Sequence, residues 1–138
     1  GLIFGGGNPG SVANNESWNG TAWTEEGDTN NARSASDSVG TSSESAILFA
    51  GTSDSVGHMD ETESWNGSTW TEVNDLNTGV YGVGRAGTAT AALAYGGNLP
   101  PNNKTGETES WNGTSWTEVA DLNTVRENIA GDGRCCKC

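Results

Sequence analysis

The residue types that carry most enzyme chemistry are few in this sequence, and they stand apart from one another. His58 is the single histidine, and it lies beside Met59 and Asp60, with no second histidine to share work on a metal or a proton. A weak nucleophile needs a neighbouring base to activate it, and the sequence shows no motif that would provide one. We therefore predict no enzyme, no catalytic residues and no cofactor.

Carboxylates are plentiful, and several occur as close pairs, namely Glu25 with Glu26, Glu61 with Glu63, and Glu107 with Glu109. Two neighbouring carboxyl groups can divide the roles of acid and base between them. These pairs, however, recur at equivalent places along the chain, whereas a catalytic pair is normally needed once per site. We interpret them as part of a solvated acidic face on surface strands.

Two other groups of residues could bind a metal. The oxygen-rich segment SDSVG occurs at 36–40 and 53–57, but Ser and Asp at this spacing are typical of turns, and no EF-hand pattern is present. The chain ends in CCKC at 135–138, which we assign as a Cys-rich tail. A structural or non-native tail, a disulfide to another chain and a thiolate metal site lacking a fourth ligand are its alternative interpretations, and we predict no metal site.

Charge and composition restrict the partners. The 138 residues suffice for one domain, and 18 acidic against 6 basic residues give a net charge of −12. A nucleic-acid partner needs a basic surface, so none is expected. No apolar run approaches the roughly 20 residues of a membrane span, so we expect no membrane insertion. The chain begins with Gly and shows no basic signal region, which favours a processed product or a piece of a longer protein.

One phrase with two tryptophans is repeated three times, and it sets the organisation of the chain. It occurs as ESWNGTAW at 16–23, ESWNGSTW at 63–70 and ESWNGTSW at 109–116. An apolar run that ends in small residues, mostly glycine, precedes each copy, at 2–7, 47–52 and 93–97, and an acidic connector and a weak strand follow it. Each repeat therefore contains four strand-like pieces and no helical period. The repeats run near 1–46, 47–92 and 93–134.

The repeated phrase predicts a β-hairpin with an Asn-Gly turn, which favours a type I′ geometry. The turns are Asn19-Gly20, Asn66-Gly67 and Asn112-Gly113. In the third copy Trp111 and Thr114 would flank the turn, and Trp111 and Trp116 would be diagonal neighbours on one face of the sheet. Because Leu and Ile are scarce, we expect the tryptophans to form the core, and they are Trp18, Trp23, Trp65, Trp70, Trp111 and Trp116. The same turn asparagines are also sequons, so in a glycosylating host they could carry sugar.

These repeats resemble the kelch family. Its pattern of an apolar strand with a double glycine matches Gly5-Gly6 and Gly96-Gly97, with Ala50-Gly51 as a partial match. Its tryptophan matches the second Trp of each phrase, and its arginine matches Arg33 and Arg126, with Val80 in the middle copy. The chain departs from the family in having Trp where Tyr is usual and in a shorter turn. The repeats are also similar to kelch-type repeats of environmental phage and bacterial structural proteins.

The resemblance implies an all-β fold of kelch-like β-propeller blades over residues 1–134. We expect about three four-stranded antiparallel blades, circularly offset, because the chain starts at the second strand of one blade and ends in the first strand of another. Three blades leave a ring incomplete unless more chain or oligomerisation completes it. Some kelch-fold enzymes are copper oxidases with Tyr, His and Cys ligands, and a chain with one histidine cannot assemble that site.

The expected function is a non-catalytic structural or interaction module in an extracellular or virion-surface assembly. Its partners would be proteins, a second copy of the chain or the rest of a larger chain, with surface glycans as a further option. The alternative is a carbohydrate-binding propeller, which a repeated polar site would favour and these loops do not show. Candidate binding residues lie in the loops that differ between repeats, and they are Asp54, His58, Asp60, Asn102, Asn103 and Lys104.

Overall fold

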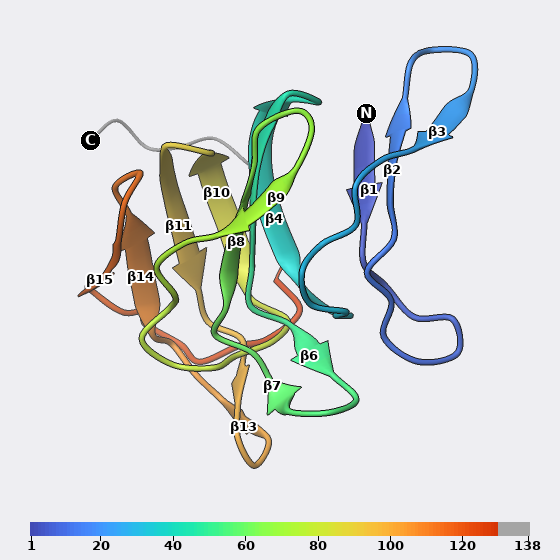
Figure 1. Cartoon of the computed structure of the whole chain (residues 1–138). Coiled ribbons are helices and arrows are strands. Elements are labelled where there is room, and N and C mark those ends of the chain that lie inside the picture. Colours follow the sequence, from blue (N-terminus) through green and yellow to red (C-terminus); the bar gives the residue numbers. More distant parts are fainter. Residues whose placement is uncertain (130–138) are drawn as a thin grey trace.

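The computed structural model describes residues 1–129, and every regular element within them is a β-strand. Three antiparallel sheets stand side by side in chain order and do not close into a ring (Figure 1). The predicted all-β architecture of blade-like sheets is confirmed. The CCKC segment and most of the strand expected at 127–134 lie outside the described residues.

Two of the three sheets have four strands. The middle sheet has the order β4 (Asp37–Ser42), β5 (Ser45–Phe49), β8 (Thr62–Trp65) and β9 (Trp70–Glu72). The last sheet repeats it with β10 (Gly84–Thr88), β11 (Ala91–Tyr95), β14 (Thr108–Trp111) and β15 (Trp116–Val119). In both, the first strand comes from the end of one sequence repeat and the other three from the next repeat, which confirms the circular offset.

The first sheet has three strands, β1 (Leu2–Phe4), β2 (Asn15–Trp18) and β3 (Trp23–Glu25). Its register matches the other two, because Leu2 pairs with Ser17 as Ile47 pairs with Ser64 and Leu93 with Ser110. Positions can therefore be compared between sheets one by one. Within residues 1–129, β1 pairs on one side only, whereas β5 and β11 are paired on both sides.

The core lies between neighbouring sheets. Ile47, Leu48 and Phe49 of β5 are almost completely buried, as expected for a strand covered on both faces. Leu48 packs with Trp65 and Trp70 towards the first sheet, and Ile47 and Phe49 pack with the tryptophans of the last sheet. Successive side chains of one strand thus belong to two different junctions.

The tryptophan hairpins differ from the predicted turn. Trp111 and Trp116 are direct cross-strand partners, joined by the four residues between them. The side-chain Oδ1 of Asn112 accepts hydrogen bonds from the backbone N–H of Thr114 and of Ser115, each at 2.9 Å. Only Gly113 of the pair has a positive φ, 95°. The type I′ turn and the diagonal placement are therefore wrong, because the asparagine side chain shapes this turn rather than its backbone.

The tryptophans of each hairpin nevertheless lie on one face, as predicted, with ring centroids 5.3 to 5.4 Å apart in all three copies. The expectation that all six belong to the core holds for Trp65, Trp70, Trp111 and Trp116, which are buried. Trp18 and Trp23 are exposed, because no sheet within residues 1–129 covers their face.

Small hairpins occupy the end of the molecule opposite the Asn-Gly turns (Figure 1). They are β6 (Thr52–Ser53) with β7 (Gly57–His58), and β12 (Asn98–Leu99) with β13 (Asn103–Lys104). In the first sheet a single bridge between Gly7 and Ser11 takes their place. Each loop connects the two strands that occupy the central positions of the four-stranded sheets, which are β5 with β8 and β11 with β14, and in the first sheet the equivalent β1 with β2.

The glycines after each apolar strand let a connector cross close to the sheet. The N–H groups of Gly6, Gly51 and Gly97 donate to the carbonyls of Arg33, Val80 and Arg126, each at 2.8 Å. A Cβ on Gly97, whose φ is +103°, would lie 2.9 Å from the carbonyl oxygen of Tyr81. The connector therefore requires glycine there. No helix that could cross a membrane is found in residues 1–129.

Candidate functional site

The junction between the first two sheets is held by a buried ion pair. Arg33 Nη2 lies 2.6 Å from Glu63 Oε1, and both side chains are completely buried. The other guanidinium nitrogen donates to the carbonyl of Glu61 at 2.8 Å. Asn30 donates to Glu63 Oε2 from its backbone N–H at 2.7 Å and from its side chain at 2.9 Å. Both carboxylate oxygens of Glu63 and two guanidinium nitrogens of Arg33 are thus paired, as a buried charge requires, whereas Arg33 Nε has no hydrogen-bond partner among the described residues.

The second junction repeats the carboxylate but not the arginine. Glu109 takes the place of Glu63 and accepts from the backbone N–H of Asn77 at 3.1 Å and from its side chain at 2.6 Å. Val80 occupies the position that Arg33 has at the first junction. The Arg33 N–H donates to the Val12 carbonyl and the Val80 N–H to the Met59 carbonyl, each at 3.1 Å, and the carbonyls of Arg33 and Val80 accept from Gly6 and Gly51. Leu76, Val80 and Val83 join the hydrophobic core there. The chain therefore uses an ionic contact at one junction and an apolar contact at the next.

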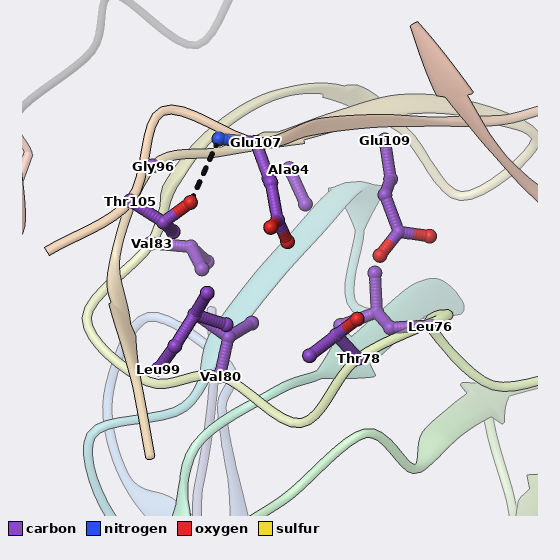
Figure 2. Close-up of a pocket in the computed structure, with 10 residues that line it drawn as sticks. All are labelled: Leu76, Thr78, Val80, Val83, Ala94, Gly96, Leu99, Thr105, Glu107 and Glu109. Carbon is purple, nitrogen blue, oxygen red and sulfur yellow. Dashed lines mark hydrogen bonds between the residues drawn. The ribbon is translucent and has the colours of Figure 1, made fainter. Parts of the chain in front are cut away.

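A small cavity of about 10 Å³ lies at this second junction, close to the space that one water molecule needs. Figure 2 shows the carboxylates of Glu107 and Glu109 directed towards Thr78 and Val80 across it. Burial raises the pKa of Glu109, its hydrogen bonds from Asn77 lower the pKa, and the charges of Glu107 and Glu118 raise it. The cavity is too small for a substrate, and we assign the cluster a structural role.

This arrangement corrects the interpretation of the paired carboxylates. Glu63 and Glu109 were expected on a solvated face, but they are 0% and 8% exposed. Their burial follows from the connector of the preceding sheet, which covers each carboxylate and supplies its donors. The recurrence of Asn30 before Glu63 and of Asn77 before Glu109, at spacings of 33 and 32 residues, was the available sequence signal. Only the structure shows that these residues meet across a junction.

The acidic SDSVG segments have two different structures. Residues 36–40 largely enter β4, where Asp37 forms an ion pair with Arg85 of β10. Burial raises the pKa of Asp37, while Arg85 acts to lower it. Residues 53–57 form the β6–β7 hairpin. Within residues 1–129 no group of three His, Cys, Asp or Glu side chains is placed to hold a metal ion.

Five of the six loop candidates lie on the loops 52–58 and 98–104. Together with loop 7–13, these loops form one end of the molecule, which we call the loop end (Figure 1). Asp54 reaches the neighbouring loop, where its Oδ2 accepts from the Ser11 N–H at 2.9 Å. His58 packs on Tyr81 with ring centroids 4.9 Å apart. Each loop thus contacts the sheet or connector beside it.

The remaining candidates are exposed. Lys104 lies 3.4 Å from Glu127 Oε1, and hydrogen bonding from Asn98 lowers the pKa of Glu127, assisted by Lys104. Asn102 and Asn103 form the tip and second strand of the β12–β13 hairpin. Asp60 lies just outside its loop, with its carbonyl bonded to Leu76 N–H at 3.0 Å.

Comparison with known proteins identifies the architecture. No family model and no curated protein match the sequence. Among solved structures, that of YjhT superposes with a TM-score of 0.74 at 12% sequence identity, and the match covers 94% of this chain. The chain spans 51% of the length of YjhT. At this identity the likeness concerns the fold alone.

Proposed function

We propose that this chain is a non-catalytic interaction module, a segment of a kelch-like β-propeller in an extracellular or virion-surface assembly, which binds protein partners through its loop end. One observation carries the proposal. The three loops of the loop end share a place in the fold but not a sequence, whereas the repeated residues are used in turns and junctions. Exposed loop residues that differ between the repeats are not needed for the repeated fold, so they can provide specific contacts to a partner.

Charge and shape indicate the kind of partner. The chain carries a net charge of −12, so a complementary protein surface would be basic and the association would weaken with salt. Val56, at the tip of the β6–β7 hairpin, is 66% exposed and offers an apolar contact beside the polar loop residues. The extracellular or virion setting rests on the resemblance of the repeats to phage and bacterial structural proteins.

A random peptide display library tests the loop end as a binding surface. Peptides enriched on the wild-type chain should bind Asp54→Ala and Val56→Ala at least about tenfold more weakly, a loss of about 1.4 kcal/mol. They should bind Asn66→Ala, altered at the opposite end, with unchanged affinity. Enriched peptides that bind the two loop variants as tightly as the wild type would exclude the loop end.

Carbohydrate binding is the second candidate, and the exposed Trp18–Trp23 pair favours it. Aromatic faces offer apolar contact with a polar edge, which suits a sugar ring. A panel of mono- and oligosaccharides, titrated by tryptophan fluorescence, should change the signal of the wild type and not that of Trp23→Ala. A panel without any response would remove this candidate.

A further inference from the structure

The outer face of the first sheet exposes residues that are buried everywhere else in the molecule. Ile3, Trp18 and Trp23 are 51%, 38% and 49% exposed. The residues at the same register positions in the middle sheet are Leu48, Trp65 and Trp70, which are 0%, 2% and 6% exposed. A contiguous apolar face of this kind marks an interaction surface.

The exposed tryptophans already have the geometry of a buried pair. The ring centroids of Trp18 and Trp23 are 5.3 Å apart with a 44° angle between the ring planes. The buried pair Trp111 and Trp116 has 5.4 Å and 44°. The face is therefore preorganised, and a partner would meet little cost of side-chain ordering.

The internal junctions show which aromatic group covers such a pair. Phe4 of the first sheet meets Trp70 edge-on at 4.9 Å, and Phe49 of the middle sheet meets Trp116 in the same way at 4.9 Å. Tyr95 holds this position in the last sheet, because it pairs with Thr108 as Phe49 pairs with Thr62. Within residues 1–129 no sheet follows Tyr95, so its matching tryptophan would be Trp23 of another molecule.

The polar groups on the two outer faces are also complementary, with a carboxylate on one face and its expected donors on the other. Glu16 holds the register position of Glu63 and Glu109, and among the described residues no hydrogen bond reaches its carboxylate. The donors expected for it lie at the far end of the chain. Asn123 follows the pattern of Asn30 and Asn77, and Arg126 that of Arg33. Arg126 is exposed, and within residues 1–129 its side chain makes one hydrogen bond, from Nε to the Thr124 carbonyl at 3.2 Å.

The connectors provide a third match. The Asn128 N–H donates to the Gly82 carbonyl at 2.8 Å, and the Gly82 N–H donates to the Ala35 carbonyl at 3.3 Å. All three residues have positive φ, between 49° and 63°. Each of these bonds runs from the N–H of one connector to the carbonyl of the connector before it. The Ala35 N–H is therefore placed to donate to the Asn128 carbonyl of a neighbouring molecule.

We propose that the Trp18–Trp23 face of one copy receives the Tyr95–Arg126 face of a second copy, in the geometry of the two internal junctions. Two such contacts would join two copies head to tail into a closed ring of six sheets. This chain matches 51% of the length of YjhT, which is the share that one of two joined copies would occupy. The inference rests on the proposed role as an assembly module and names one of its partners.

Charge reversal tests the pairing of the two ends. Light scattering after size exclusion should give the wild type twice the 14.2 kDa mass of the chain. Glu16→Arg and Arg126→Glu should each be monomeric, because each places like charges at both contacts. An equimolar mixture of the two variants should regain the doubled mass, since both contacts then join an arginine to a glutamate.

Two control variants test whether a loss of the doubled mass is specific to the proposed contacts, rather than a result of any charge change or of a change at the loop end. Asp28→Arg removes an exposed carboxylate away from these contacts and should keep the doubled mass. Val56→Ala, chosen to weaken peptide binding at the loop end, should also keep it, so the two proposals can fail independently. A monomeric wild type, as expected if other blades of a longer polypeptide or a sugar occupy the face, would overturn the second-copy proposal. A mixture that stays monomeric would overturn it as well.

Discussion

At the scale of single residues, the two junctions show two ways of filling the same place. Arg33 satisfies a buried carboxylate by charge and by hydrogen bonds, whereas Val80 leaves Glu109 to the donors of Asn77. The neighbouring residues at this junction are apolar like Val80, since Leu76 and Val83 line the same cavity. The consequence is that the two carboxylates should respond differently to mutation and to pH.

Replacing Arg33 by Met should lower the free energy of unfolding by about 3–5 kcal/mol, because Glu63 would keep a buried charge without its partner. Urea denaturation at fixed protein concentration measures this change. The double variant Arg33→Met/Glu63→Gln should recover a large part of the loss, since a neutral amide is cheaper to bury. Lys104→Met, which breaks an exposed pair, should cost only about 0–1 kcal/mol. An equal loss in the two single variants would contradict the buried pairing.

The raised pKa of Glu109 predicts a specific pH dependence. A carboxyl whose pKa is higher in the folded than in the unfolded state binds protons more tightly when folded. Stability gained from that proton is therefore lost as pH rises from below 4.5, the reference pKa of glutamate, through the folded pKa. Relative to the wild type, Glu109→Gln should become progressively more stable as pH rises across this window.

Urea unfolding of both proteins at a series of pH values checks this expectation. Asp28→Asn, which removes one surface carboxylate, controls for the change in net charge. A difference between Glu109→Gln and the wild type that stays constant or shrinks as pH rises would show that burial does not govern this carboxyl.

At the scale of elements, the glycines after each apolar strand fix the distance between strand and connector. Gly97→Ala would add a Cβ at 2.7 Å from Val80 Cγ2 and 2.9 Å from the Tyr81 carbonyl. Gly20 has a similar φ, +104°, but nothing lies within 4 Å of its added Cβ. Gly20→Ala should therefore cost only backbone strain, of order 1–3 kcal/mol, and Gly97→Ala clearly more. Thermal or urea unfolding of the two variants measures the difference, and equal losses would mean that the connector can move away.

At the scale of the whole molecule, the first sheet is the least protected part of an isolated chain. It is covered on one face and has three strands, so its amides should open more readily than those of β5 and β11. In monomeric Glu16→Arg, hydrogen exchange of 2–4 and 15–18 should be faster than exchange of 45–49. In the wild type the same amides should slow as protein concentration rises. Protection that is independent of concentration would argue against coverage of this face by a second copy.

Much of this architecture is determined by the sequence alone, because it depends on local properties. The spacing of the tryptophans at 47 and 46 residues, the apolar runs and the Asn-Gly turns predict repeated antiparallel strands. Alternation along a strand places both tryptophans of a hairpin on one face. The turn type could not be predicted, since the Asn112 side chain competes with the backbone for the bonds that define the turn.

Burial was decided only by the tertiary structure, because it depends on which sheet comes next. The same phrase gives a buried pair in Trp65 and Trp70 and an exposed pair in Trp18 and Trp23. Likewise, Glu63 is buried only because a connector from the preceding sheet brings Arg33 onto it. Local sequence determines the strands of each sheet. The contacts between sheets join residues 30 to 67 positions apart, from Arg33 with Glu63 to Phe49 with Trp116, and they determine which copies form core and which form a surface for a partner.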